Sequence, residues 1–360
     1  MNKTGFNFSA GPALLPIPVL EALSSALIDC EGSGYSLFEL PHRGDAFLAI
    51  LPELEQRTRA LLNVPDEFDV LFTPGGATMQ FSAVPLNLCT QGYRGGYIIS
   101  GYFSEEAYKE ADRISSVYPL WNGGAATLPI ERLEPARGTD FVFYCDNETA
   151  DGKEFSRVPN IELGDAALVA DVSSNIFSRP IDWSRHGAVF ASLQKNMGTA
   201  GASIVIVRRD LYGSIGDRVP MLLDWRSYAR ENNMPGTPPM VAMYTALLML
   251  RWLDKEGGVE VMDERAKARS AKIYSVLDAY PDFYLGVPSP EVRSRINVVF
   301  KLPNSELEAC FLKESDAAGL YGLKGHFARG GIRASLYNAM PQAGADALSS
   351  FLQYFHSRHA

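Results

Sequence analysis

FASLQKNMGTAG, residues 190–201, carries a lysine, Lys195, after a run of small and apolar residues, and ASIVIVRR, residues 202–209, follows directly. The SIVIV part is apolar throughout, which is typical of a central β-strand that has no solvent-exposed face. Lys195 therefore falls at the end of a predicted buried strand. A long cationic side chain is unusual at such a place and needs partner groups elsewhere in the chain.

Short apolar runs alternate with helix-like segments, such as SEEAYKEADRI (104–114), through about the first two-thirds of the chain. This alternation predicts an α/β fold with a mainly parallel sheet that is covered on both faces. In open sheets of this kind, ligands bind beyond the carboxyl ends of the strands. The predicted strands are DVLFTP (69–74), GYIIS (96–100), DFVFYCD (140–146), AALVADV (166–172), AVFASLQ (188–194) and ASIVIVRR (202–209).

The last part of the chain predicts a second, smaller α+β domain. The clearest helix pattern is TPPMVAMYTALLMLRWLDKEGG (237–258), with Thr237 as its predicted cap and Gly257 near its end. Beyond it, helix patterns at 264–280, 306–319 and 345–360 alternate with strand patterns at 293–302 and 330–336. We expect a large domain over residues 16–258 and a small domain over residues 259–360. The Pro- and Gly-rich N-terminal arm, residues 1–15, could belong with either part and is assigned to the small domain.

Composition excludes several classes of protein. The 360 residues include 46% hydrophobic and 21% charged residues and carry a net charge of −9, which fits a folded globular protein and disfavours nucleic-acid binding. The four cysteines show no metal-ligand spacing, so neither a metal site nor a disulfide framework is expected. The N-terminus has no signal-peptide pattern and the longest apolar segment is too short to span a bilayer. We expect a cytoplasmic protein without membrane contact.

Asp171 is the candidate partner of Lys195. It also ends an apolar run and precedes Lys195 by 24 residues. Taken singly, a lysine is more often exposed to solvent, and an aspartate after a strand is as often a local cap. Together they match pyridoxal phosphate, which needs a lysine for its Schiff base and a carboxylate to keep its pyridine nitrogen protonated.

Two further features agree with this cofactor. Gly75 and Gly76 lie between a predicted strand and a probable helix, where free N–H groups and the helix dipole suit a phosphate, and Thr78 adds a hydroxyl. Thr237 is a second possible anion site. Phe103, at the end of another strand, is placed to stack on a ring. Each signal is weak alone, since Gly-Gly after a strand is usually only a turn.

Nine segments of the chain resemble the phosphoserine aminotransferase family, and the similarity runs from about residue 5 to the C-terminus with the expected spacing. This family belongs to the class V, fold-type I pyridoxal-phosphate transferases. The combination of SLQKN, SRPID and RASLYNAMP is specific. The segments are FSAGPALLP, HRGDAF, GGATMQFSAVPLNL, YCDNETADG, VADVSSNIFSRPID, SLQKNMGTAG, TPPMVAMY, RSRINVVF and KGHFARGGIRASLYNAMP.

The resemblance implies roles for individual residues and a homodimer with active sites at the subunit interface. Lys195 and Asp171 would be catalytic, and both would hold pyridoxal 5'-phosphate. The other expected cofactor-binding residues are Ala77, Thr78, Phe103, Thr149 and Gln194, with Gly236 and Thr237 from the other subunit. The expected substrate-binding residues are Arg333 for the α-carboxylate, and His42, Arg43 and His326 for the phosphate of phosphoserine or the distal carboxylate of glutamate.

The chain departs from the family pattern at three of these places. Phe327 replaces an arginine that is expected to meet the substrate phosphate, and Arg329, two residues on, is a candidate replacement. Gly236 replaces the asparagine that is usual in the family, and Phe103 replaces the usual tryptophan. The first two departures concern the substrate more than the cofactor.

The expected activity is reversible amino-group transfer between glutamate and 3-phosphohydroxypyruvate, as in serine biosynthesis, with a related step of pyridoxine biosynthesis as a second use. One alternative is a class V aminotransferase that acts on an unphosphorylated oxo-acid such as glyoxylate. A remoter one is a catalytically silent protein that binds the cofactor or a phosphate, against which the presence of both Lys195 and Asp171 argues.

Overall fold

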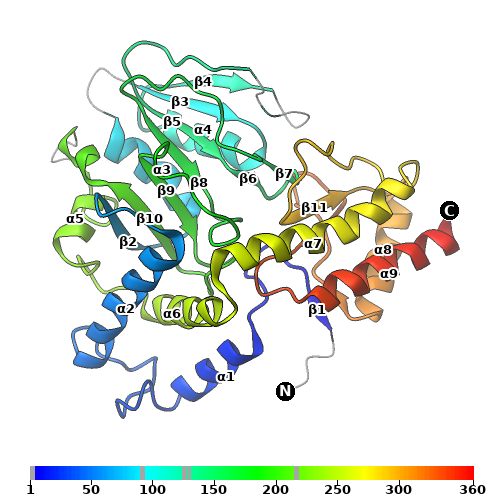
Figure 1. The fold of residues 1–360 in the computed structure, drawn as a ribbon, viewed down its shortest axis with the longest axis horizontal. Coiled ribbons are helices and arrows are strands. Elements are labelled where there is room, and N and C mark those ends of the chain that lie inside the picture. The colour runs from blue at the N-terminus through cyan, green and yellow to red at the C-terminus, as the bar shows by residue number, and fades with distance from the viewer. Residues whose placement is uncertain (1–4, 90–93, 124–127, 129–130, 215–218) are drawn as a thin grey trace.

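A seven-stranded sheet forms the centre of the larger part of the protein, seen here in a computed structural model that describes residues 5–89, 94–123, 128, 131–214 and 219–360 (Figure 1). The strand order is β2-β10-β9-β8-β5-β3-β4. All six predicted strands are present in it. The strands are β2 (Phe68–Pro74), β3 (Arg94–Ile99), β4 (Val117–Asn122), β5 (Thr139–Cys145), β8 (Ala167–Asp171), β9 (Ala188–Ser192) and β10 (Ala202–Arg208).

Strand directions place several loops at one edge of this sheet. β10 runs antiparallel to both of its neighbours, β2 and β9, and every other neighbouring pair is parallel. Because β2 and β9 are both antiparallel to β10, they run in the same direction. The carboxyl ends of β2, β3, β5, β8 and β9 therefore share an edge, as the prediction of a mainly parallel α/β sheet requires.

Alternate side chains of each strand pack into cores on opposite faces of the sheet. Along β5, Phe141 and Phe143 belong to one core, whereas Val142 and Tyr144 belong to the other. Because both faces are covered, the central strands β8, β9 and β10 are buried over nearly their whole length and are mainly apolar. The first core is completed by α3 (Ala77–Leu88), α4 (Tyr102–Asp112), α5 (Trp225–Arg230) and the 3-10 helix η1 (Arg209–Ser214), and the second by α1 (Ile17–Ala26), α2 (Asp45–Leu62) and α6 (Met240–Lys255).

A separate core lies in the C-terminal part. It packs the pair β11 (Asn297–Phe300) and β13 (Ile332–Ser335), and the pair β1 (Phe6–Asn7) and β12 (Leu320–Tyr321), against helices. These helices are α7 (Gly258–Ala279), α8 (Ser305–Ala317) and α9 (Gln342–His359), and Figure 1 shows α7 running from the sheet to this part. Among the described residues, no helix is long and apolar enough to cross a membrane.

The packing supports a division into two domains. Leu14 contacts the C-terminal core, whereas Leu15 contacts the core of the sheet. Val259 and Met262, in the first turns of α7, still pack on the sheet side, and Ile273 packs on the C-terminal side. We propose that residues 16–258 form the large domain and that residues 1–15 and 259–360 form the small one, with α7 bridging them.

The prediction that Thr237 caps the helix after it is wrong. α6 begins at Met240, its N-cap residue is Pro239, and no side chain caps it. Two consecutive prolines cannot donate backbone N–H groups to a threonine hydroxyl, so the threonine lies before the helix rather than at its start. The prediction that this helix ends near Gly257 is confirmed. Gly257 follows the last turn of α6 with a φ of 103°, in the left-handed region that favours glycine.

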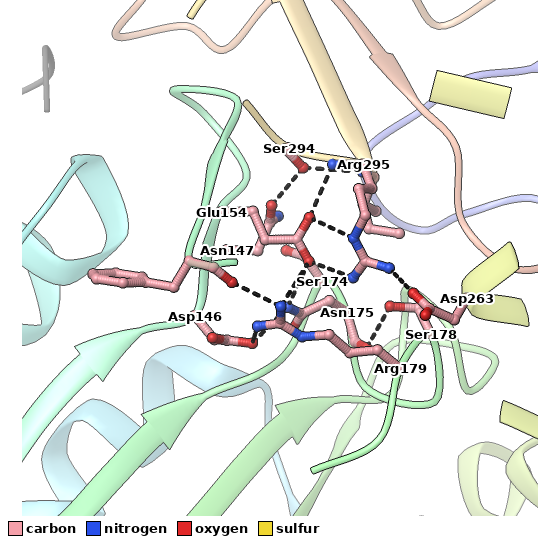
Figure 2. A network of polar contacts seen from close by, with 12 residues as sticks. Asp146, Asn147, Glu154, Ser174, Asn175, Ser178, Arg179, Asp263, Ser294 and Arg295 are labelled. Carbon is pink, nitrogen blue, oxygen red and sulfur yellow. Dashed lines mark hydrogen bonds and ion pairs between the residues drawn. The ribbon is translucent and has the colours of Figure 1, made fainter. Parts of the chain in front are cut away.

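A buried ionic network joins the two proposed domains (Figure 2). Glu154 accepts hydrogen bonds from the backbone N–H of Arg295 at 2.9 Å and from its guanidinium at 2.7 Å. The same arginine also pairs with Asp263 of α7. Burial alone would raise the pKa of Glu154, but Arg295 and Arg179 hold it below its usual value. The network therefore keeps its charges while it fixes β11 against the large domain.

Candidate active site

Lys195 lies beyond the end of β9, in the edge where the carboxyl ends of the strands meet. Its partly buried Nζ donates to Thr149 Oγ1 and Ser174 Oγ, each at 2.9 Å, and lies 5.4 Å from the centre of the Phe103 ring. Burial lowers the pKa of Lys195 to about 8, the charge of Asp171 opposes this, and that of Arg333 adds to it. A lysine with this pKa is partly neutral near physiological pH and can act as a nucleophile.

Asp171 is the last residue of β8, the strand next to β9, and only 7% of it is exposed. Its Oδ1 accepts a hydrogen bond from the Ser173 backbone N–H at 2.8 Å. Burial raises the pKa of Asp171, and the charge of Lys195 opposes that rise. A cation held against this carboxylate would keep it ionised, and the carboxylate would in turn stabilise the cation.

The start of α3 forms a cradle for an anion at the same edge. Gly75 has a φ of 81°, and a Cβ there would lie 2.5 Å from Met79 Sδ, so no other residue fits without strain. Gly76 is the N-cap residue, and no side chain caps the helix. The N–H groups and the positive end of the helix dipole are therefore directed at whatever occupies the site, beside Ala77 and Thr78.

These groups surround one cavity of about 230 Å³. The structure brings nine of the predicted site residues together in its wall, namely Ala77, Thr78, Phe103, Thr149, Asp171, Gln194, Lys195, His326 and Arg333. Gly76, part of the predicted phosphate cradle, also lines it, and the structure adds residues that sequence reasoning did not assign, namely Ala10, Gly11, Phe81, Asn147, Ser173, Ser174 and Ser192. Ser173 and Ser174 follow Asp171 after a single residue, Val172, so the small hydroxyl residues after that aspartate were the available signal.

Four predicted residues do not line this cavity: His42, Arg43, Gly236 and Thr237. Arg43 and Thr237 are exposed, and the other two are partly exposed. Gly236 and Thr237 were expected at the site of another subunit rather than at the site of their own chain. His42 and Arg43 carried no such expectation, and a single chain does not bring them to Lys195.

At the mouth of the cavity, the small domain contributes charged and aromatic side chains. Arg333 of β13 donates to the Thr149 carbonyl oxygen at 3.5 Å, and the His326 ring lies 5.8 Å from that of Phe103. Phe327 is 85% exposed. Arg329, the candidate replacement for the missing arginine, donates from Nε to Asp151 at 2.8 Å and lines a different hollow, so it does not face Lys195.

The residues present fit pyridoxal 5'-phosphate. Lys195 would supply the amine that binds the aldehyde carbon, and Asp171 the buried carboxylate that pairs with the ring nitrogen. The uncapped start of α3 would bind the phosphate. On neighbouring strands of a mainly parallel sheet, this arrangement defines the class of fold-type I pyridoxal-phosphate-dependent transferases.

Comparisons with known proteins place the chain within that class. The sequence model of the family described as aminotransferase class-V matches residues 5–348. A phosphoserine aminotransferase of Acidithiobacillus ferrooxidans is 42% identical over 363 residues, which cover 100% of each chain. A solved phosphoserine aminotransferase of Bacillus circulans subsp. alkalophilus has a TM-score of 0.94 and 34% identity over 99% of each chain. The pyridoxal-phosphate-bound enzyme of Trichomonas vaginalis has a TM-score of 0.90 and 35% identity, covering 97% of this chain and 99% of that one.

The chain belongs to the class-V aminotransferase family. It is a pyridoxal-phosphate-dependent aminotransferase, and the fold and cofactor expected from the sequence are confirmed.

The lowered pKa of Lys195 predicts how cofactor attachment depends on pH. Only the neutral amine can attack an aldehyde, and its fraction rises as the pH rises through about 8 rather than through 10.5. We expect the rate of cofactor loading onto the apoprotein to rise about tenfold per pH unit below pH 8 and to level off above about pH 9. Stopped-flow absorbance across a pH series measures this. A rate that keeps rising beyond pH 10 would show an unperturbed lysine.

Proposed function

We propose that the protein transfers an amino group between glutamate and 3-phosphohydroxypyruvate and so forms phosphoserine. The main support is the set of full-length relatives at about 40% identity that carry the name phosphoserine aminotransferase. The site supports it too, because the cavity that holds Lys195 and Asp171 also holds Arg333, a cation suited to an α-carboxylate.

Each side chain has a task that follows from its position. Pyridoxal phosphate, when bound, supplies an electron-accepting ring for the bond that breaks at the substrate Cα. Arg333 would bind the α-carboxylate through two parallel N–H bonds and so orient the Cα–H bond. Lys195, once its amine is free, would carry the proton at Cα, because its pKa of about 8 lies near working pH. Asp171 would hold the proton on the ring nitrogen.

Recognition of the distal group is proposed to need a second copy of the chain. Within one chain only His326, of the three predicted residues, reaches the cavity. Exposed apolar side chains lie on both sides of His42 and Arg43 in sequence, and another, Leu222, lies next to Gly236, where a Cβ would be 3.5 Å from its Cδ2. Exposed large apolar side chains are typical of protein interfaces. These residues are Leu27, Ile28, Tyr35, Phe38, Leu48, Met221 and Leu222.

We therefore propose a homodimer in which these four residues of one chain complete the site of the other. This would bring the side chains of His42 and Arg43 to the phosphate of phosphoserine, and Gly236 and Thr237 to the phosphate of the cofactor.

One observation favours the alternative with an unphosphorylated oxo-acid. Phe327 occupies the place of an expected arginine, and Arg329 is paired with Asp151 rather than directed into the cavity. A substrate phosphate would then have fewer cations around it than in the family pattern. The identity of the full-length relatives outweighs this observation.

Half-reactions of the cofactor-loaded protein separate the two candidates. Adding phosphoserine, glutamate, alanine or glycine to excess enzyme and following the visible absorbance gives the rate of each amino-group transfer without a second substrate. We expect phosphoserine and glutamate to react much faster than alanine and glycine. Comparable rates for alanine and phosphoserine would favour the alternative.

A further inference from the structure

The segment NETADGKE, residues 147–154, buries more charge than the proposed chemistry uses. It forms a hairpin of β6 (Asn147–Glu148) and β7 (Lys153–Glu154). Glu148 is 0% exposed and Asp151 is 9% exposed, yet of this segment only Thr149 contacts Lys195 through a hydrogen bond. Buried carboxylates are costly unless they are hydrogen-bonded, so their partners indicate their role.

Both carboxylates bind the start of α4. Phe103 N–H donates to Glu148 Oε2 at 2.9 Å, and Ser104 N–H donates to Glu148 Oε1 at 3.0 Å. Tyr102 N–H donates to Asp151 Oδ2 at 2.7 Å. The first N–H groups of a helix have no partner within the helix, and negative charge is favourable there. The N-cap residue, Gly101, has no side chain to bind these groups, so two side chains from a distant hairpin bind them instead, while Ser104 Oγ accepts from the Gly101 N–H at 3.0 Å.

The close approach depends on Gly101, the N-cap residue of α4. A Cβ at Gly101 would lie 2.6 Å from Asp151 Oδ2 and 2.6 Å from Glu148 Cδ. Any side chain at that position would push the carboxylates away from the helix. Burial raises the pKa of Glu148, and its bonds from Ser104 and Phe103 oppose that rise.

The first turn of α4 also presents the ring that borders the cofactor site. Phe103, whose N–H is bound by Glu148, has its ring 5.4 Å from Lys195 Nζ. Thr149, next to Glu148 in the hairpin, accepts a hydrogen bond from the same Nζ at 2.9 Å. One short turn therefore sets the lysine and the facing ring relative to each other.

The small domain is tied to this turn through Asp151. Its Oδ1 accepts from Arg329 Nε at 2.8 Å, and the guanidinium lies 5.7 Å from the centre of the Tyr102 ring. Arg329 follows His326 by three residues, and the His326 ring lies 4.4 Å from that of Tyr102. Arg329 thus connects the loop at the mouth of the site to the helix that carries Phe103.

We propose that Glu148 and Asp151 are positioning residues that hold the start of α4 and so place the Phe103 ring against the cofactor. Arg329 connects Asp151 to the small domain and does not bind the substrate phosphate. The proposal rests on the cofactor site and not on the identity of the oxo-acid.

Glu148→Gln tests the proposal, with Glu154→Gln as the matched control in the same hairpin. Both residues are buried carboxylates, but Glu154 contacts Arg295 and not α4. For Glu148→Gln we expect about tenfold weaker cofactor binding, since a charge-assisted bond to the helix start is lost, and an altered visible circular dichroism of the bound cofactor. For Glu154→Gln we expect both cofactor properties to stay within twofold of wild type, although the protein unfolds at lower urea concentration.

Wild-type affinity and dichroism in Glu148→Gln would overturn the proposal, and so would equal losses in both variants. Neither readout needs a substrate, so both test the proposal independently of the proposed reaction.

Arg329→Gln is the second variant, because its partly exposed side chain can be replaced without threatening the fold. We expect an altered dichroism and equal loss of the half-reactions with glutamate and phosphoserine. A loss confined to phosphoserine would place Arg329 on the substrate phosphate and contradict us.

Discussion

Lys195→Ala is expected to reduce transamination by about 10⁴-fold, at the upper end of what a positioned proton-transfer group contributes. Among the described residues that line the cavity, Lys195 is the only lysine, and its partners Thr149 and Ser174 are hydroxyls that cannot replace it as a base. Steady-state turnover with glutamate as donor measures the effect. The fold should persist, because the amine contributes two hydrogen bonds at a partly exposed position.

A small primary amine added to Lys195→Ala should restore part of the activity, since it can enter the space that the side chain leaves. The matched control is Lys301→Ala, which removes an exposed lysine of the small domain and should leave turnover unchanged. Turnover of Lys195→Ala within tenfold of wild type would refute the assignment.

Arg333→Ala is expected to lower kcat/KM by about 10²- to 10³-fold for both glutamate and phosphoserine. Both amino acids carry the same α-carboxylate, and the half-buried guanidinium lines the cavity beside Thr149. Removing it leaves the carboxylate without its charge-assisted partners and leaves the Cα–H bond unoriented. Steady-state kinetics with each substrate in turn measure the effect.

Arg293→Ala is the control for that variant. Arg293 is an arginine of the same proposed domain that pairs with Asp278 on the outside of α7, away from the cavity, and its loss should leave kcat/KM unchanged. A loss in Arg333→Ala that affects phosphoserine alone would mean that Arg333 binds the distal phosphate instead.

The sheet was predictable where burial is complete. β5, β8, β9 and β10 are apolar on both faces, so their sequences could hardly form anything else. β4 was not predicted, because this edge strand reads VYPLWN and keeps two of its six residues exposed. The two-residue pairing of β1 with β12 joins positions more than 300 residues apart, and such short strands leave no periodic signal.

The candidate site was predictable where a residue ends a buried strand. Asp171 is the last residue of β8, Lys195 follows the end of β9 by three residues, and neighbouring parallel strands bring their ends together. Asn147, Glu148 and Ser174 were not assigned, because their contacts depend on segments distant in sequence. His42 and Arg43 were predicted only by resemblance, and their distance from the cavity of one chain reflects the second chain that we propose.

Borohydride reduction of the cofactor-loaded protein, followed by proteolysis and mass spectrometry, tests the central assignment most directly. The reductant fixes the bond between the cofactor's aldehyde carbon and a lysine amine, so the modified residue can be located. We predict that the pyridoxyl mass lies on the peptide containing Lys195. Finding it on another lysine, or on none, would contradict the account.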